Sequence, residues 1–132
     1  TYEKSCGGIV YRKFHGNTEI LLIKHVKSGT GHSVENGETE EETAKREIKE
    51  ETGIDVYIDS GFRETVTYSP RKDAKKEVVY FVARARNYDY TPQLEEISDI
   101  RWVGIGQAHN LLVYDNDKLI VNKAKSFIAL MK

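Results

Sequence analysis

The sequence predicts an α/β domain in which a mixed β-sheet lies between helices. Strand-like runs, rich in β-branched and aromatic residues, come before and after one sharply delimited helix at 39–52, and an apolar helical pattern closes the chain at Leu119–Met131. At 132 residues, the chain has the length of one domain, residues 1–132, and can bury a substantial core without disulfides. Strands and helices mixed in this way favour a layered sheet covered by helices.

The first two elements are predicted to be strands joined as a hairpin. Cys6–Phe14 and Ile20–Val26 are β-rich runs, and the turn residues His15–Asn17 separate them. Gly7 and Gly8 interrupt the first run, which indicates a bulge or a place where backbone or ligand approaches closely.

The central helix has start and stop signals at both ends. Thr39 is a predicted N-cap, and Glu42 stands three residues later, which is the capping-box spacing. Gly53 follows Thr52 as a predicted left-handed C-cap. The helix is therefore expected to run from about Thr39 to Thr52.

The second half of the chain is predicted to complete the sheet and add two helices. Its expected elements are two β-rich runs, IDVYI and FRETVTY, divided at Asp59–Gly61, a charged turn at 69–76, strands at Glu77–Ala85 and Ser98–Val103, a loop at Asn87–Gln93, and helices at Ala108–Leu112 and Leu119–Met131.

Composition narrows the function classes. The net charge of −1 gives no global field for recruiting a polyanion, so a long nucleic acid would need a local basic patch. The single cysteine, Cys6, excludes an internal disulfide and suits a reducing compartment, so a cytoplasmic location is expected. No apolar run approaches the roughly 20 residues of a membrane span, and no signal peptide is visible.

Three carboxylates crowd one face of the central helix. Glu47, Glu50 and Glu51 fall within an arc of roughly 100°, because positions three and four apart are neighbours on a helix. Like charges at this spacing cost a few tenths of a kcal/mol per pair, and anions in a last turn oppose the helix dipole. Hard divalent cations bind such oxygen ligands, so a metal-binding face is one interpretation. The alternative is a solvated acidic face with nearby lysines and Arg46 as partners.

The surrounding pattern favours the metal-binding interpretation. From Glu38 the chain reads E-TEEETAK-REIKEETGI, which resembles the Nudix box G-x(5)-E-x(7)-R-E-U-x-E-E-x-G-U, where U is aliphatic. From its first Glu onward, every fixed position is matched, by Glu38, Arg46, Glu47, Ile48, Glu50, Glu51, Gly53 and Ile54. The chain is therefore similar to the Nudix hydrolase family.

This resemblance implies a fold and a branch of the family. The implied fold is an α/β/α sandwich with a mixed sheet. SCGGIVYR, KKEVVYFVA and EEISDIRWV look most similar to the branch that hydrolyses dinucleoside polyphosphates, such as the asymmetric diadenosine tetraphosphate hydrolases. Branches that remove pyrophosphate from RNA 5′ ends share several of these segments.

The resemblance also implies a reaction and its residues. Water would attack a phosphorus of a nucleoside polyphosphate, with Mg²⁺ or Mn²⁺ neutralising charge, and diadenosine tetraphosphate would yield ATP and AMP. Glu47, Glu50 and Glu51 would be metal ligands, one of them polarising the water. Arg46 and Glu38 would form an ion pair that orients this face.

Four further site residues are expected outside the box. Lys76 and Tyr80 share one face of a strand and would contact phosphate or base, the alternative being an exposed Lys and a half-buried Tyr. Tyr114 would stack on a base, or would simply pack at the surface. Glu96 would bring a further carboxylate to the metals as a general base, or would belong to a solvated acidic loop.

The box departs from the family pattern at its start. The position of its opening Gly falls on His32, and Gly31 lies one residue too early. The loop Lys27–Gly37 lacks the stretch resembling W-G-F-P-K-G-H-V-E that the branch usually carries. Either the loop is shortened or residues near Ser33 are missing from the chain, and both affect the expected metal site.

Three functional hypotheses follow from the sequence. The first is hydrolysis of dinucleoside polyphosphates. The second is an RNA 5′ pyrophosphohydrolase, for which the basic turn Arg71, Lys72, Lys75 and Lys76 would meet an RNA backbone. The third is a nucleotide-binding module of the same fold that has lost the reaction, as the altered loop suggests.

Overall fold

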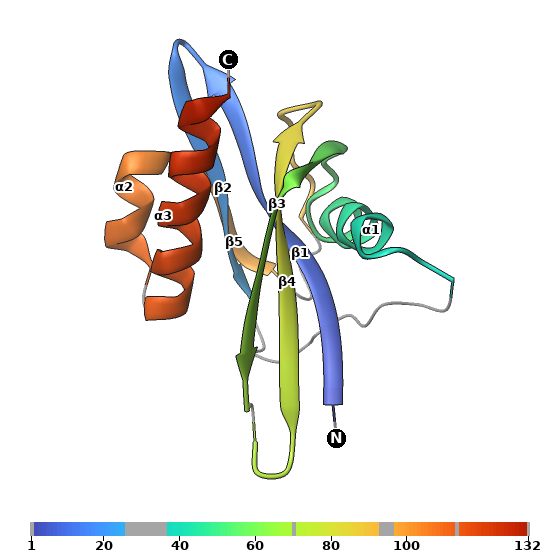
Figure 1. The fold of residues 1–132 in the computed structure, drawn as a ribbon. Helices are drawn as coiled ribbons and strands as arrows, with labels where there is room; N and C mark the ends of the chain where they lie inside the picture. Colours follow the sequence, from blue (N-terminus) through green and yellow to red (C-terminus); the bar gives the residue numbers. More distant parts are fainter. Residues whose placement is uncertain (1, 26–36, 70, 93–96, 113, 132) are drawn as a thin grey trace.

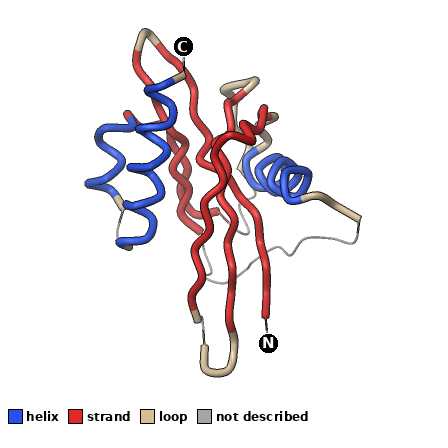
Figure 2. Tube along the Cα trace, in the orientation of Figure 1, coloured by secondary structure: helices blue, strands red, loops and turns tan. Residues whose placement is uncertain are grey.

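The protein is an α/β/α sandwich built on a five-stranded mixed sheet. The computed structural model describes residues 2–25, 37–69, 71–92, 97–112 and 114–131. Its elements are β1 (Tyr2–Phe14), β2 (Asn17–His25), α1 (Glu40–Thr52), β3 (Val56–Tyr68), β4 (Lys75–Ala85), β5 (Ile97–Gly104), α2 (Ile105–Leu111) and α3 (Asp115–Leu130). Helix α1 covers one face of the sheet, and α2 and α3 cover the other (Figures 1 and 2). The predicted fold class is confirmed.

The sheet has the order β3-β4-β1-β2-β5 and divides along its middle. Strands β1 and β4 pair in parallel from Tyr2↔Lys75 to Tyr11↔Arg84. The antiparallel ladder between β1 and β2 runs only from Tyr11↔Ile20 to Phe14↔Asn17. Toward Tyr2, therefore, β1 pairs with β4 alone, and β2 pairs with β5. The two strands separate as they run away from their hairpin (Figure 1).

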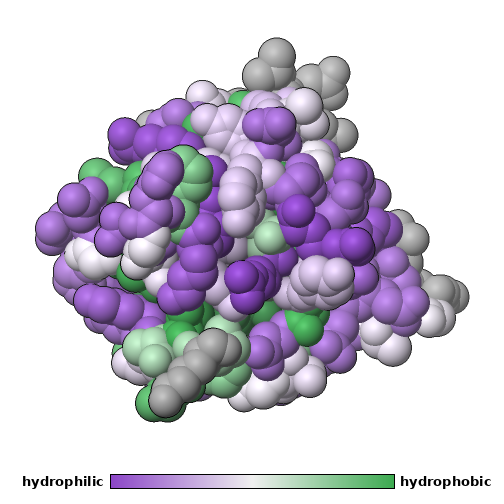
Figure 3. Space-filling view, turned by 90° about the horizontal axis from the view of Figure 1, so that it is seen from above, coloured by the Kyte–Doolittle hydropathy of each residue, from purple (hydrophilic) through white to green (hydrophobic). Residues whose placement is uncertain are grey.

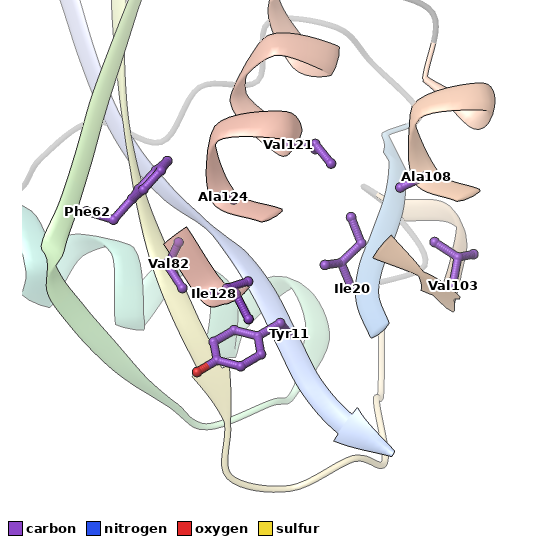
Figure 4. Packing of buried hydrophobic residues seen from close by; sticks show 9 residues of the cluster. All are labelled: Tyr11, Ile20, Phe62, Val82, Val103, Ala108, Val121, Ala124 and Ile128. Carbon is purple, nitrogen blue, oxygen red and sulfur yellow. The ribbon is translucent and has the colours of Figure 1, made fainter. Parts of the chain in front are cut away.

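Apolar side chains fill both sides of the sheet. The cluster under α2 and α3 contains Tyr11, Ile20, Phe62, Val82, Val103, Ala108, Val121, Ala124 and Ile128 (Figure 4). The cluster under α1 contains Val10, Leu21, Ile48, Ile54, Val56, Ala83 and Ala85. Alternate residues of each strand supply the two clusters, as the period of a strand requires. Burial of these side chains at about 25 cal/mol per Å² holds the layers together.

Several element boundaries differ from the prediction; for example, β2 begins at Asn17 instead of Ile20 and α2 at Ile105 instead of Ala108. Strand β1 begins at Tyr2, not Cys6, because the parallel ladder with β4 extends it. Residues 56–68 form one strand, and the predicted break at Asp59–Gly61 is a shift in register between Asp59 and Arg63. Helix α3 begins four residues before Leu119, at Asp115. In each case, tertiary packing or pairing extends an element beyond its apolar pattern.

The surface is mainly polar at one end of the molecule. Viewed from above, the end at which the C-terminus lies, hydrophilic side chains cover most of the surface, and apolar ones gather in smaller patches (Figure 3). Within the described ranges, no helix has the length and apolarity needed to cross a membrane.

Candidate active site

Helix α1 is fixed at both ends by its own sequence. The Thr39 hydroxyl accepts the Glu42 N–H at 3.1 Å, and a Glu42 carboxylate oxygen accepts the Thr39 N–H at 3.0 Å. At the other end, Gly53 has φ +76° and donates its N–H to the Lys49 carbonyl at 2.9 Å. Both predicted caps are confirmed. They hold the carboxylate-bearing helix at a defined length.

Glu38 lies just before α1 and is fixed by two side chains of that helix. Arg46 donates to it bidentately, from Nε to Oε2 at 2.8 Å and from Nη2 to Oε1 at 3.0 Å. The Thr43 hydroxyl donates to Glu38 Oε1 at 3.0 Å. Bidentate arginine–carboxylate pairs are among the stronger charge-assisted contacts. The structure thus brings the two residues of the predicted orienting pair together, while their role in the reaction stays a prediction.

The same guanidinium also contacts the carboxylate face. Arg46 Nη1 lies 2.8 Å from Glu47 Oε1 and 3.3 Å from Glu50 Oε2. Glu47 is 5% exposed, whereas the Glu50 side chain is 46% exposed. Glu51 is partly buried. The guanidinium of Arg46 therefore contacts both a buried and an exposed carboxylate of the α1 face. The exposed carboxylate, that of Glu50, is open to a ligand.

The donor set suits a hard divalent cation. Carboxylate oxygens are the ligands that Mg²⁺ and Mn²⁺ prefer, and three of them lie on neighbouring positions of α1. Among the residues that the structure describes, no three acidic, histidine or cysteine side chains converge as a complete metal site. Glu96, Gly31, His32 and most of the loop Lys27–Gly37 lie outside the described residues. The predictions made for them stay predictions.

Lys76 and Tyr80 lie on the opposite face of the sheet, toward α3. They alternate along β4 with Val82, which belongs to the cluster under α3. Lys76 is 6% exposed, so the alternative of an exposed lysine is wrong. Tyr80 is partly buried, and burial, with smaller contributions from the negative charges of Asp117 and Tyr68, raises its pKa to about 12.

Tyr114 precedes helix α3 and occupies its N-cap position. It is 71% exposed, so its ring is available for stacking. It lies neither on α1 nor within the sheet. The proposed substrate-binding residues thus come from β4 and the start of α3, and the carboxylates come from α1.

A second ion-pair network was missed by the sequence analysis. Glu40 of α1 accepts from Arg63 Nε and Nη2, both at 2.8 Å, and also pairs with Lys4. The hydrogen bonds from Arg63, then from Lys4, lower the pKa of Glu40 to about 2. Arg63 is 23 residues away in sequence, so no local spacing could have indicated the pair.

The segment after β4 is attached to the C-terminal end of α1. Thr91 donates its N–H to the Thr52 carbonyl at 2.7 Å. A Cβ added to Gly53 would lie 2.0 Å from Thr91 Oγ1. Asp55 N–H donates to Asn87 Oδ1 at 2.9 Å. Gly53 is therefore needed both for its positive φ and for the close approach of Thr91, and only the first reason was visible in the sequence.

The same segment is also attached to the sheet by an arginine among aromatic rings. The Arg12 guanidinium lies 4.4 Å from the centre of the Trp102 ring and 5.1 Å from that of Tyr88, and it pairs with Glu19 at 2.7 Å. Trp102 Nε1 donates to the Tyr88 carbonyl at 3.2 Å. Cation–π contacts of this kind stabilise by about 0.5–2 kcal/mol. We therefore interpret this cluster as structural.

Comparison with known proteins gives a consistent result. The NUDIX domain family matches residues 3–124. The chain is 31% identical over 141 residues to the asymmetrical bis(5'-nucleosyl)-tetraphosphatase of Rattus norvegicus, covering 95% of each chain. It is 30% identical over 135 residues to the enzyme of the same name from Caenorhabditis elegans, covering 96% of each. A crystal structure of a C. elegans Ap4A hydrolase binary complex superposes with a TM-score of 0.83 at 29% identity, covering 96% of this chain and 98% of that one.

Proposed function

Since the chain belongs to the NUDIX family, we propose that its reaction is the hydrolysis of dinucleoside polyphosphates, with diadenosine tetraphosphate cleaved to ATP and AMP. The chain is a Nudix pyrophosphohydrolase of nucleoside polyphosphates, by its family and its relatives. The observation that carries the proposal is the contact of Arg46 with Glu38, Glu47 and Glu50 on one face of α1.

Charge explains why such a face would serve this reaction. A polyphosphate repels an incoming oxygen nucleophile, so catalysis depends on positioning and on cations placed where charge accumulates. Glu47, Glu50 and Glu51 would hold Mg²⁺ or Mn²⁺, which would supply charge neutralisation and lower the pKa of bound water. Family membership supports a divalent cation in general.

The residues of the chain itself would position the reaction. Arg46, anchored bidentately by Glu38, holds Glu47 and Glu50 at fixed places on the helix. Glu50 is the more exposed of the two and is the side chain that we propose to accept a proton from the attacking water. Lys76, Tyr80 and Tyr114 would hold the phosphate chain and a base.

A second candidate function, removal of pyrophosphate from RNA 5′ ends, is favoured by one observation. The turn between β3 and β4 extends beyond the helices, and its Arg71, Lys72 and Lys75 are exposed (Figure 1). An RNA backbone meeting these cations would release counterions, so its affinity would fall steeply with salt. Weak or salt-insensitive binding of 5′-triphosphorylated RNA would remove this function from consideration.

We propose a cytoplasmic location. Cys6 is 5% exposed, and burial is the main reason that its pKa is raised to about 11. A thiol kept protonated in this way is unreactive in thiol–disulfide exchange, which is compatible with a reducing compartment.

One assay tests the proposed reaction. A panel of nucleotides that includes diadenosine tetraphosphate would be incubated with Mg²⁺ or Mn²⁺, and the products would be separated by chromatography. We expect ATP and AMP in equal amounts. Symmetric cleavage to ADP would contradict the assigned bond, and binding without turnover under either metal would support the non-catalytic module instead.

A further inference from the structure

Thr43 is a buried threonine near the start of α1, and its hydroxyl contacts Glu38. The residue is 0% exposed. Arg46 and Glu47 follow it at three and four residues, and Glu50 at seven, so all four side chains share one face of the helix. Threonine has a lower helix propensity than alanine. What threonine adds at this position is therefore its hydroxyl group.

The Thr43 hydroxyl has one proton and two acceptors within reach. Glu38 Oε1 lies 3.0 Å from its oxygen, and the Thr39 carbonyl oxygen lies 3.1 Å from it. The Thr39 carbonyl already accepts the backbone N–H of Thr43 at 3.0 Å. Hydrogen bonds to an ionised carboxylate are roughly twice as strong as bonds between neutral groups. The proton therefore goes to Glu38.

This contact is the first in a chain of hydrogen bonds that leads to the carboxylate face. Glu38 Oε1 accepts from both Thr43 and Arg46 Nη2, and Glu38 Oε2 accepts from Arg46 Nε. The third guanidinium nitrogen, Nη1, lies 2.8 Å from Glu47 and 3.3 Å from Glu50. Because a guanidinium is planar and its donors have a fixed geometry, the orientation of Glu38 determines where Nη1 lies.

Arg46 divides one positive charge between two sets of carboxylates. One is Glu38, and the other is Glu47 and Glu50, the proposed cation ligands. A guanidinium retained by Glu38 leaves more of the negative charge of Glu47 and Glu50 to a cation. If Glu38 turned away, Arg46 would pair more closely with those two carboxylates and compete with the cation. The Arg46 and Glu38 side chains are only 24% and 19% exposed, so solvent and salt screen this competition incompletely.

We propose that Thr43 is a positioning residue for the divalent cation and that it acts through Glu38. Its hydroxyl holds the Glu38 carboxylate in the orientation that retains the Arg46 guanidinium. This inference rests on the proposed function, because it concerns the cation of that reaction. Loss of the hydroxyl should weaken cation binding, although Thr43 itself contacts neither cation nor substrate.

Mn²⁺ binding tests the inference without requiring turnover. The dissociation constant would be measured from the EPR signal of free Mn²⁺, on variants whose melting curves show that they are folded. Thr43→Val has nearly the same shape without the hydroxyl, and we expect it to bind Mn²⁺ about tenfold more weakly, as is usual when a group that orients a metal ligand is removed. Thr43→Ala should show the same loss, which keeps the test valid if valine disturbs the packing. Thr43→Ser keeps the hydroxyl and should bind Mn²⁺ as the wild type does.

Thr52→Val is the matched control. Thr52 is also a 0% exposed threonine of α1, but its hydroxyl donates to the Ile48 carbonyl at 2.6 Å and accepts the Ile54 N–H at 3.1 Å. Thr52→Val should lower the melting temperature and leave the Mn²⁺ affinity at the wild-type value. Equal losses of affinity in Thr52→Val and Thr43→Val would show that helix stability, and not the Thr43 hydroxyl, sets the affinity, which would overturn the inference.

A double-mutant cycle tests whether Thr43 acts through Glu38. Glu38→Ala removes the acceptor of the hydroxyl, so adding Thr43→Val to it should weaken Mn²⁺ binding no further. Additive losses in the double variant would contradict the route through Glu38.

The outcomes separate this inference from the proposed function. Wild-type Mn²⁺ affinity in Thr43→Val, in a chain that cleaves diadenosine tetraphosphate, would overturn the inference alone. Weakened Mn²⁺ binding in Thr43→Val would support it even in a chain that hydrolyses no dinucleoside polyphosphate. A wild type that binds no Mn²⁺ would overturn both. With hydrolysis, the Mn²⁺ concentration that gives half the maximal rate should rise in Thr43→Val by the same factor as the dissociation constant.

Discussion

Both ends of helix α1 carry glutamates, but the charged groups around these glutamates differ. At the N-terminal end, Glu40 is held by Arg63 and Lys4, both from the sheet. At the C-terminal end, Glu47 and Glu50 share contact with one Arg46. An anion is favoured by the helix dipole at the first position and opposed by it at the second. The contacts of Glu40 therefore stabilise the fold. Glu47 and Glu50 lower its stability, and a bound cation would offset that loss.

This contrast indicates how to separate structural from functional glutamates. Glu40 has its pKa lowered to about 2 by contacts that do not leave it open to a ligand. The side chain of Glu50 is 46% exposed, and its contacts with Arg46 are 3.3 and 3.4 Å long. We therefore propose a structural role for Glu40 and a binding role for Glu50, whose exposed carboxylate stands beside the buried one of Glu47.

The largest expected effect comes from removing the charge of one glutamate at each end of α1 and comparing the two variants. Glu50→Gln should lower kcat for the dinucleoside substrate by about 100-fold or more, about 2.7 kcal/mol, and should leave the melting temperature nearly unchanged, because the side chain is half exposed. Glu40→Gln should lower the melting temperature and leave kcat near the wild-type value. Comparable activity of Glu50→Gln and wild type would remove Glu50 from the reaction.

The next effect concerns the cap at the C-terminal end. Gly53→Ala should lower the free energy of unfolding by about 2 kcal/mol, because alanine at φ +76° is strained and its Cβ would clash with Thr91. Urea unfolding would measure it. Gly16→Ala is the matched control: Gly16 has φ +80° but no described atom within 4 Å of an added Cβ, so it should cost only about 1 kcal/mol. Equal costs at the two positions would show that the Thr91 contact contributes nothing.

The smallest expected effect is the loss of folding stability in acid that Glu40, at the N-terminal end of α1, should cause. The folded pKa of Glu40 is about 2 and its ordinary value is 4.5, so its contribution to stability is complete above about pH 4.5 and is lost as the pH falls toward 2. Because its partners are partly exposed, this contribution should be on the order of 1 kcal/mol.

Urea unfolding at about pH 6 and about pH 3 checks this contribution. Wild type should be more stable than Glu40→Gln at the higher pH, and the difference should shrink at the lower one. Glu41→Gln, on the same turn, should show no such change in its difference from wild type. A gap between wild type and Glu40→Gln that is the same at both pH values would contradict the assignment.

Local patterns predicted the helix and the contacts made within it. The capping box at Thr39 and Glu42, and the C-cap at Gly53, depend on residues three or four apart, which are neighbours in any α-helix. The same spacing placed Glu47 and Glu50 on one face with Arg46 beside them. The element boundaries at Tyr2 and Asp115 could not be predicted, because strand pairing and helix packing extend those elements past their apolar patterns.

By itself, the sequence determined the fold class, the helix and its carboxylate face, because these follow from short-range periodicity and capping. Only the tertiary structure decided which glutamate is structural, since Glu40 meets Arg63 across 23 residues. It also decided the burial of Lys76, the contact of Thr91 with Gly53, and the point at which β1 stops pairing with β2. These depend on sheet order and register, which bring together residues whose separation along the chain carries no signal.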